Sequence, residues 1–214
     1  MPKSNQKKVK KIVIFPFKKF YSRAEAKASL DKCIKSCGKC EGMNLPGKTE
    51  NAPGYGNVCS PIFFVGQSFC TQCMATQIPF TRGCGDILDE IFISLGKMKY
   101  DFFITNVVHC HPPNNRPSKD SEIKNCSRIL LAELNIVKPG LVIALGADAR
   151  RSVFKIYRAA PREEGKITKS QTGRTKLVWF YHPSYIVNRC GEIQRLAWKI
   201  KLTKVIKNEL RRVS

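Results

Sequence analysis

Cysteines are the residues of this sequence whose spacing most directly suggests chemistry. Cys37 and Cys40 form CGKC, a C-x-x-C pair whose two thiolates can bind one metal centre. A zinc site, an iron–sulfur cluster and a redox dithiol are all compatible with such a pair. A second pair, Cys70 and Cys73 in CTQC, would complete a zinc ribbon, but it follows the end of an expected core strand, where an active site is expected.

Two further cysteines stand alone around a loop rich in proline and asparagine. Residues 104–126 read ITNVVHCHPPNNRPSKDSEIKNC, in which Cys110 and Cys126 flank the loop. The fold could bring both back to Cys37 and Cys40, and one pair plus two distant thiolates fits a [4Fe-4S] cluster. For each cysteine the alternative is a small buried apolar residue. That alternative is favoured for Cys33, Cys59, Cys84 and Cys190.

Three histidines are present, and two of them, His109 and His111 in HCHPP, alternate along the chain. Alternate residues of an extended segment point to opposite sides, so joint binding of one ion is not expected and neither ring is assigned to a metal. The third, His182, falls at the end of an expected strand.

The length of 214 residues suits one domain, large enough to bury a core without disulfides. We expect a basic arm over residues 1–20 and a single domain over residues 21–214. No apolar signal region precedes the cysteines, and no stretch approaches the roughly 20 apolar residues of a membrane-spanning helix. We therefore expect a cytoplasmic, monomeric protein with reduced thiols and no membrane partner.

The net charge of +22, from 38 Lys and Arg against 16 Asp and Glu, is far larger than solubility requires. Such an excess indicates a polyanionic partner, since basic residues spread along the chain can contact many phosphates. The alternative is a solvated basic surface without a partner.

Apolar runs alternate with segments of helical periodicity along the chain. The expected strands are residues 61–68, 101–108, 140–146 and 176–182, and the expected helices are residues 24–37, 85–97, 121–137, 147–157 and 195–210. This alternation predicts an α/β fold with βαβ units around a parallel sheet, whose ligand site lies beyond the carboxyl ends of the strands. The residues at those ends are 66–69, 106–111, 146 and 182–185.

A series of motifs resembles the iron–sulfur uracil-DNA glycosylases, family four of the uracil-DNA glycosylase superfamily. PGYGN, VG, PFTRGCGDILDEI, ITNVVHCHPPNNRP, EIKNC, PGLVIALG and HPSYI occur in the order of that family, over about residues 30–200. The resemblance implies that Cys37, Cys40, Cys110 and Cys126 hold one [4Fe-4S] cluster. It also implies an enzyme that flips a base out of single- or double-stranded DNA.

The same resemblance suggests roles for residues at the strand ends. His182 matches the histidine that donates a hydrogen bond to O2 of the departing base, with a capping or core histidine as the alternative. Asn106 matches the asparagine that reads the base edge, since its amide can both donate and accept. Phe80 matches the ring that stacks on the flipped base, although it could equally belong to the core.

Other matches in these motifs are less specific. Asn115 corresponds to a second asparagine near the nucleotide, yet asparagine next to proline is also common in turns. The candidate contacts to DNA phosphates are Arg116, Ser184 and Arg189.

The first motif departs from the family. The family carries GEAPG where this chain has GQSFC, so Gln67 replaces the acidic residue that positions water, and Phe69 and Cys70 replace Pro and Gly. Glutamine can orient water but cannot carry the negative charge that supports a positive sugar. We hypothesise that Asp86 or the substrate phosphates supply it. The alternative for Asp86 is a charge favoured by the start of a helix. Phe69 is a candidate for the wall of the base pocket.

We therefore expect a three-layer α/β/α sandwich with a central, mainly four-stranded parallel sheet. We expect it to act as a monofunctional DNA glycosylase with a [4Fe-4S] cluster, in DNA repair and with uracil as the default base. The altered motif leaves open the excision of a modified base, such as a modified cytosine of foreign DNA in antiviral defence. An inactive iron–sulfur protein that only binds nucleic acid is the alternative of another class.

Overall fold

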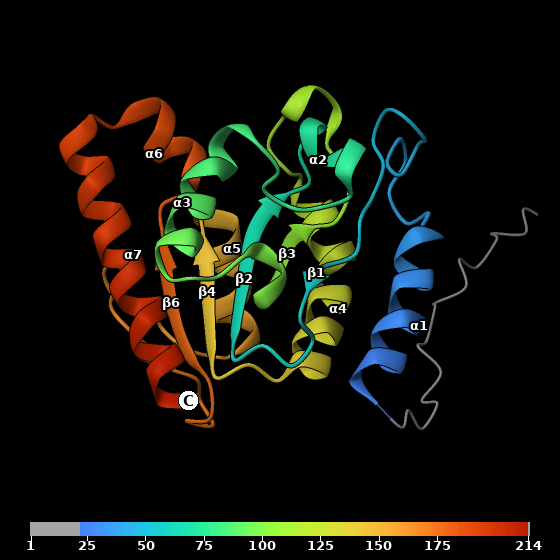
Figure 1. The fold of residues 1–214 in the computed structure, drawn as a ribbon. Helices are drawn as coiled ribbons and strands as arrows, with labels where there is room; N and C mark the ends of the chain where they lie inside the picture. Colours follow the sequence, from blue (N-terminus) through green and yellow to red (C-terminus); the bar gives the residue numbers. More distant parts are fainter. Residues whose placement is uncertain (1–21, 214) are drawn as a thin grey trace, which may run out of the picture.

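A computed structural model describes residues 22–213, and the basic arm predicted for residues 1–20 lies outside this range. The described chain forms a six-stranded sheet in the order β1-β3-β2-β4-β6-β5 (Figure 1). The central strands, all mutually parallel, are β2 (Ile62–Ser68), β3 (Phe103–Val108), β4 (Leu141–Leu145) and β6 (Lys176–Phe180). The antiparallel edge strands are β1 (Tyr55–Gly56) and β5 (Thr168–Lys169). The four central strands confirm the predicted parallel sheet.

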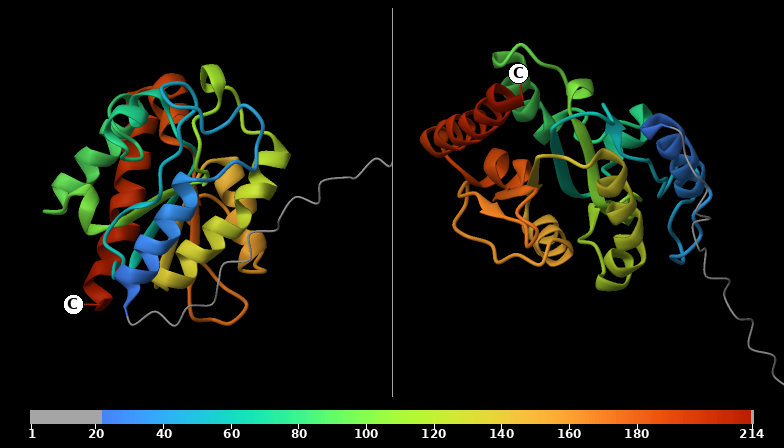
Figure 2. Two further views of the ribbon diagram at one scale, coloured as in Figure 1. Left: turned by 90° about the vertical axis from the view of Figure 1, so that its right-hand side faces the viewer. Right: turned by 90° about the horizontal axis from the view of Figure 1, so that it is seen from below.

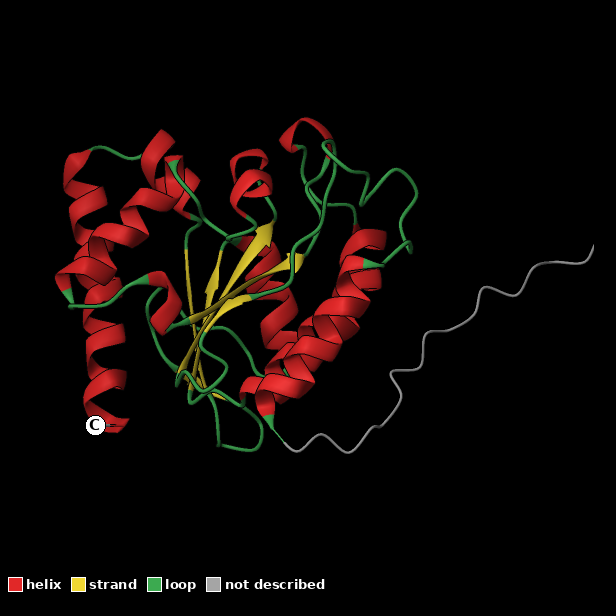
Figure 3. Cartoon of the chain, turned by 45° about the vertical axis from the view of Figure 1, so that its right-hand side comes forward, coloured by secondary structure: helices red, strands yellow, loops and turns green. Residues whose placement is uncertain are grey.

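Helices cover both faces of the sheet (Figures 2 and 3). One face packs against α3 (Asp86–Ser94) and α7 (Glu192–Val213). The other face packs against α4 (Asp120–Val137) and α5 (Ala147–Ile156), and α1 (Arg23–Lys35) packs on the outside of α4. This arrangement is the expected three-layer α/β/α sandwich.

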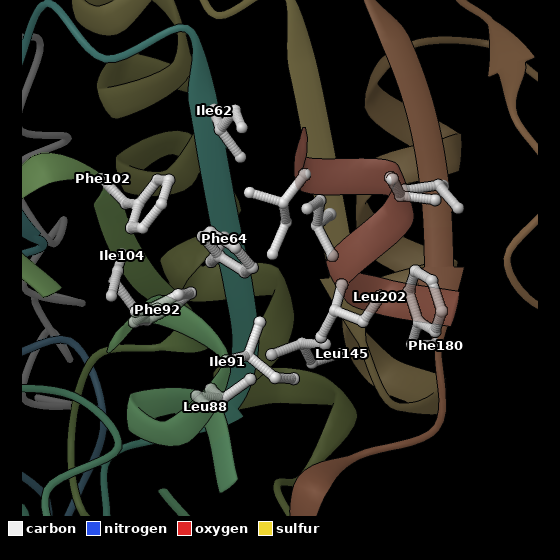
Figure 4. Packing of buried hydrophobic residues seen from close by; sticks show 14 of the residues in the cluster. Ile62, Phe64, Leu88, Ile91, Phe92, Phe102, Ile104, Leu145, Phe180 and Leu202 are labelled. Carbon is white, nitrogen blue, oxygen red and sulfur yellow. The ribbon is translucent and has the colours of Figure 1, made fainter. Parts of the chain in front are cut away.

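Strand β2 lies in the middle of the sheet and is buried on both faces. Ile62 and Phe64 join the core under α3 and α7, which Figure 4 shows, and Phe63 and Val65 join the core under α4 and α5. Side chains alternate between the two faces of a strand, so a strand covered on both sides must be apolar throughout. The continuous apolar run in the sequence therefore results from burial on both faces.

Short elements connect the strands near their carboxyl ends (Figure 1). The elements at these ends are α2 (Thr71–Thr76), α6 (Pro183–Arg189) and the 3-10 turns η1 (Gly83–Gly85) and η3 (Pro113–Asn115). A third 3-10 turn, η2 (Lys99–Asp101), instead precedes the amino end of β3. Among residues 22–213, no helix is both long and apolar enough to cross a membrane.

The expectation of reduced thiols is wrong for one pair, because Cys70 and Cys73 form a disulfide. Cys70 occupies the N-cap of α2 and Cys73 lies in the first turn of that helix, with 5.1 Å between the two Cα atoms. This separation is within the range that a disulfide spans without backbone movement. The two thiols of CTQC therefore bond to each other, and they do not complete a zinc ribbon with CGKC.

Cys59 also differs from expectation. It is exposed, whereas a small buried apolar residue was predicted. It lies in a turn outside β2, where Ser60 Oγ bonds to the backbone of Ile62 and begins the strand. The other three cysteines of that group are half-buried.

Candidate active site

The carboxyl ends of the four parallel strands meet at one edge of the sheet, where two predicted site residues lie opposite each other. Gly66 of β2 pairs in register with Asn106 of β3. A Cβ atom at Gly66 would lie 2.3 Å from Oδ1 of Asn106 and 2.6 Å from Cζ of Phe80. Real Cβ atoms do not approach so closely, so glycine at this position lets the Asn106 amide and the Phe80 ring share one space.

Asn106 is a buried polar residue with 5 % of its surface exposed. Within residues 22–213 its side-chain amide forms no hydrogen bond. Its amide atoms are not among the fully buried polar atoms without a partner, so they keep some access to the surface at the strand end. The amide is thus available to a ligand, and the base-reading role of Asn106 stays a prediction.

Phe80 is held in an unusual backbone conformation. Its φ angle is +57°, and its carbonyl oxygen accepts a 2.8 Å hydrogen bond from Nζ of Lys99, which also bonds to Asp89. Gly85 packs directly on the same carbonyl, which leaves no room for a side chain there. A left-handed conformation is costly for an aromatic residue and persists where surrounding contacts enforce it, often at functional sites.

The Phe80 ring is both part of the core and next to a histidine. It is 7 % exposed and belongs to the hydrophobic cluster under α3, and its centroid lies 5.7 Å from the centroid of His182 at an interplanar angle of 33°. The sequence left two roles open for Phe80, a core residue and a ring that stacks on the base. The two roles are compatible, because most of the Phe80 ring packs in the core and it also lies next to the His182 ring.

His182 is fixed at the start of α6. Its Nδ1 accepts a 3.2 Å hydrogen bond from the backbone N–H of Ser184 and lies 2.8 Å from Oγ of the same residue. A backbone N–H can only donate, so Nδ1 carries no proton and the proton of a neutral ring lies on Nε2. Gly146, with a φ of +94°, allows the close approach of the His182 side chain, since a Cβ there would lie 3.2 Å from Cβ of His182.

Burial also determines the charge of His182. Removal from water lowers the pKa of His182 to about 4, because the charged ring is poorly solvated in this position. The imidazole is therefore neutral near pH 7, and its Nε2–H is a donor.

The residues of the altered first motif, and the proposed substitute carboxylate Asp86, lie in different surroundings. Gln67 is half-buried, and its side chain forms no hydrogen bond with another residue of the described chain. Phe69 is 1 % exposed and packs with Ala52 and Cys73, so its ring lies in a separate apolar cluster. Asp86 is exposed and lines a groove of about 400 Å³ between α3 and the α6–α7 region. Gln67, Asn106 and His182 do not line that groove.

A second groove, of about 620 Å³, lies beside the loop after β3. It is lined by Asn115, His111 and Thr71, together with residues of the 42–49 loop. Thr71 Oγ1 lies 3.2 Å from Nε2 of His111 and donates to Oδ1 of exposed Asn115 over 3.4 Å. Nδ1 of His111 lies 3.1 Å from the carbonyl oxygen of Phe69. His111 thus connects the first motif to the Asn115 loop, a role that its position in HCHPP did not reveal.

The three candidate DNA contacts differ in their surroundings. Arg116 donates to Glu122 and also to the carbonyl oxygen of Pro117, and Glu122 is buried. The hydroxyl of Ser184 already contacts Nδ1 of His182. Arg189, at the end of α6, is exposed and forms no ion pair within residues 22–213.

The four cysteines predicted as ligands come together from three segments. Cys40, Cys110 and Cys126 form an apolar cluster with Met43 and Val108. Burial, and then the nearby thiols of Cys126, Cys37 and Cys40, raise the pKa of Cys110 to about 12. As placed here, no group of three or more His, Cys, Asp or Glu side chains in the described residues is arranged to hold a metal ion. The donor set still fits a thiolate-bound centre, because buried, crowded thiols are stabilised as thiolates by a bound cation.

A buried ion pair lies beside Cys126. His109 is 1 % exposed and its Nε2 lies 3.2 Å from Oε2 of Glu133, which is completely buried. Glu133 also accepts a 2.8 Å hydrogen bond from the backbone N–H of Gly54. Although burial disfavours the charged ring, the Glu133 carboxylate raises the pKa of His109 to about 10. Since His111 bonds to Thr71 and Phe69 instead, the two histidines have separate partners.

Comparisons with known proteins agree with the motifs. Residues 53–206 match a family described as the Uracil DNA glycosylase superfamily. The chain is 31 % identical to a type-4 uracil-DNA glycosylase of Archaeoglobus fulgidus over 170 residues. The aligned region covers 75 % of this chain and 84 % of that protein. A type-4 uracil-DNA glycosylase of Thermotoga maritima is 33 % identical over 183 residues, or 82 % and 91 % of the two chains. One of Pyrobaculum aerophilum is 31 % identical over 176 residues, or 78 % and 88 %.

Proposed function

The chain belongs to the uracil-DNA glycosylase superfamily, and we propose that it removes uracil from DNA as a monofunctional glycosylase. In this reaction the bond between N1 of uracil and C1′ of deoxyribose breaks, and its electron pair stays on the base. Water adds its oxygen to C1′ and its proton ends on the base. The products are free uracil and an abasic site.

The observation that carries the proposal is the neutral His182 beside the Phe80 ring and the strand end that holds Asn106. Negative charge develops on O2 of the departing uracil, and a donor already oriented toward it lowers the barrier without reorganisation. His182 has its proton on Nε2 because Ser184 bonds to Nδ1, so it can donate there. It acts as a hydrogen-bond donor to the anionic base and need not give up its proton.

Recognition of the base is assigned to Asn106 and Phe80. A pyrimidine edge carries adjacent donors and acceptors, and the Asn106 amide has both and lacks a partner in the described protein. A flipped base loses its stacking in the duplex, and an aromatic ring replaces part of that contact. Gln67, which follows Gly66 at the end of β2, is assigned to orienting the attacking water.

The test is an excision assay on single- and double-stranded oligonucleotides, read by alkaline cleavage of the abasic product. The substrates carry uracil, hypoxanthine, a thymine mismatch, 5-hydroxymethylcytosine or glucosylated cytosine, and His182→Ala is the control. We expect uracil release that the control loses. Release of only a modified cytosine would instead indicate a defence enzyme, and binding without any release would indicate an inactive nucleic-acid-binding protein.

We further propose that Cys37, Cys40, Cys110 and Cys126 hold a [4Fe-4S] cluster. The support is a set of four thiols from three segments in an apolar setting, with Nδ2 of Asn125 only 3.3 Å from the sulfur of Cys40. When bound, such a cluster would cross-link α4, the loop after β3 and the loop after α1, a structural role. Hydrogen bonds to the sulfurs tune such clusters.

Metal analysis tests this proposal directly. Protein purified without oxygen is expected to be brown and to contain iron and sulfide. Cys110→Ser should lose iron, whereas Cys59→Ser, which changes an exposed cysteine outside the set, should retain it. A colourless, zinc-loaded protein would overturn the cluster.

A further inference from the structure

Two exposed tyrosines flank His182 in the sequence. Tyr181 is 46 % exposed and Tyr185 is 48 % exposed, although large aromatic side chains are usually mostly buried. Their rings stack on each other, with centroids 5.1 Å apart and an interplanar angle of 29°. We refer to Tyr181 and Tyr185 as the tyrosine pair. Figure 1 shows α6, which carries Tyr185, at the carboxyl-end edge of the sheet.

The tyrosine pair is rigidly supported from below. Trp179, at 9 % exposure, meets the Tyr181 ring edge-on at a centroid distance of 5.4 Å, and its Nε1 donates to the carbonyl oxygen of Arg162. The backbone of Tyr181 donates to Glu164, and the backbone of Tyr185 donates to the carbonyl oxygen of His182. The backbone bonds hold the two residues in place and the ring contacts restrict their side chains, so less conformational entropy would be lost when a ligand stacks on them.

Two arginines and one carboxylate, that of Glu164, lie around the same surface. The Arg150 guanidinium lies 4.5 Å above the Trp179 ring, and Arg189 is exposed. Tyr185 and Arg189 are four residues apart on α6, a spacing that places them on one face of a helix. Aromatic faces beside basic side chains are the combination with which proteins hold unpaired bases and their phosphates.

We propose that the tyrosine pair is a stacking platform for an unpaired DNA base next to the nucleotide flipped toward His182. This inference rests on the proposed glycosylase function and deepens it, because it names unpaired or single-stranded DNA as the preferred substrate. The occupant is nucleic acid and not protein, because the platform adjoins His182 and lies in a chain of net charge +22. Stacking on a base needs no sequence-specific contact, so the platform accepts any base.

The experiment uses the full chain and single-stranded oligonucleotides that contain 2-aminopurine and no uracil. Binding is measured by anisotropy and stacking by quenching of 2-aminopurine fluorescence. Tyr185→Ala should weaken single-strand binding by about fivefold or more and abolish most of the quenching, because stacking of one base contributes that much or more. Tyr185→Phe keeps the ring and should behave like the unchanged protein.

Tyr100→Ala is the matched control, because Tyr100 is 58 % exposed but belongs to η2, outside the tyrosine pair. It should leave both signals unchanged. Full affinity and full quenching with Tyr185→Ala, in a protein with unchanged thermal unfolding, would overturn the platform. Since these oligonucleotides contain no uracil, a platform that stacks normally in a protein without excision activity would overturn only the proposed function.

Discussion

The backbone N–H of Ser184 donates to Nδ1 of His182, which leaves the proton of the neutral imidazole on Nε2. The hydroxyl of Ser184 lies 2.8 Å from the same nitrogen. The residue predicted to contact a DNA phosphate therefore also orients the proposed catalytic ring. Three features of this small segment thus serve one purpose: the N-cap position, the bond to Ser184 and the burial of the ring.

The first prediction concerns pH. Because burial lowers the pKa of His182 to about 4, the ring stays neutral throughout the range in which an ordinary histidine titrates. The single-turnover rate of uracil excision should therefore show no His182 step near pH 6.5 and should fall only as the pH approaches 4. A loss of activity with a midpoint near pH 6.5 would contradict this assignment.

The same shift has a consequence for stability. Since the folded pKa lies below the unfolded value of 6.5, the unfolded chain takes up a proton first as the pH falls. The free energy of unfolding should therefore decrease between about pH 6.5 and pH 4. His182→Gln, which cannot titrate, should show a smaller decrease over that range in urea unfolding.

The second prediction concerns Gly66. A methyl group there would meet Oδ1 of Asn106 at 2.3 Å and the Phe80 ring at 2.6 Å, so Gly66→Ala must displace both. We expect a stability loss of about 1–3 kcal/mol from overpacking. Displacement of groups that hold the substrate should slow excision by roughly 100-fold. Single-turnover rates and urea unfolding measure the two effects. An unchanged rate would mean that Asn106 and Phe80 do not both contact the base.

Regular elements were predictable from the sequence, and short or irregular ones were not. The apolar runs and helical periodicity identified the four parallel strands and the long helices. β1 and β5 have two residues each, too few to leave an alternating pattern. The left-handed backbone of Phe80 depends on Lys99 and Gly85, and no local signal reveals those contacts.

Ion pairs between a loop and α4 explain what sequence reasoning missed in the site. Glu133 lies in an amphipathic helix, where a glutamate is expected at the surface, yet it is buried against His109. Arg116 was expected to face DNA, and it bonds to Glu122, which is buried beside the cysteine loop. In both cases a charged residue is buried because a partner from another segment compensates its charge.

The third prediction separates two roles of Arg116, contact with a DNA phosphate and stabilisation of the fold through Glu122. The hydrogen bond from Arg116 lowers the pKa of Glu122, so its contribution to stability is present above the unfolded pKa of 4.5 and is lost as the pH falls. Arg116→Ala leaves a buried carboxylate without its partner and should cost about 1–3 kcal/mol at pH 7, with a smaller cost near pH 4. Chemical unfolding at the two pH values measures this.

DNA binding provides the comparison for Arg116. A lost phosphate contact would weaken binding for all sequences and reduce the salt dependence of the affinity by about one unit of slope. Arg189→Ala, which removes an exposed arginine without an ion pair in the described chain, should show that change with no loss of stability. If Arg116→Ala altered only the salt dependence, its contact with Glu122 would contribute little to folding.

The last prediction concerns the charge missing from the first motif. A carboxylate beside C1′ would stabilise the positive sugar, and Gln67 cannot provide it. If the side chain at position 67 contacts the attacking water, Gln67→Glu should therefore accelerate uracil excision by about tenfold or more. If the rate fell, Gln67 would act through its amide and not merely occupy the place of a carboxylate.

Asp86→Asn tests the alternative source of that charge. A role in catalysis predicts slower excision, but Asp86 is exposed in a groove that His182 and Gln67 do not line. We therefore expect an unchanged rate, which would leave the phosphates of the substrate to supply the charge. Replacing the phosphates that flank the uracil with uncharged methylphosphonates should then slow excision by the unchanged protein more than by Gln67→Glu. Equal slowing in both proteins would exclude the phosphates as the substitute for the carboxylate.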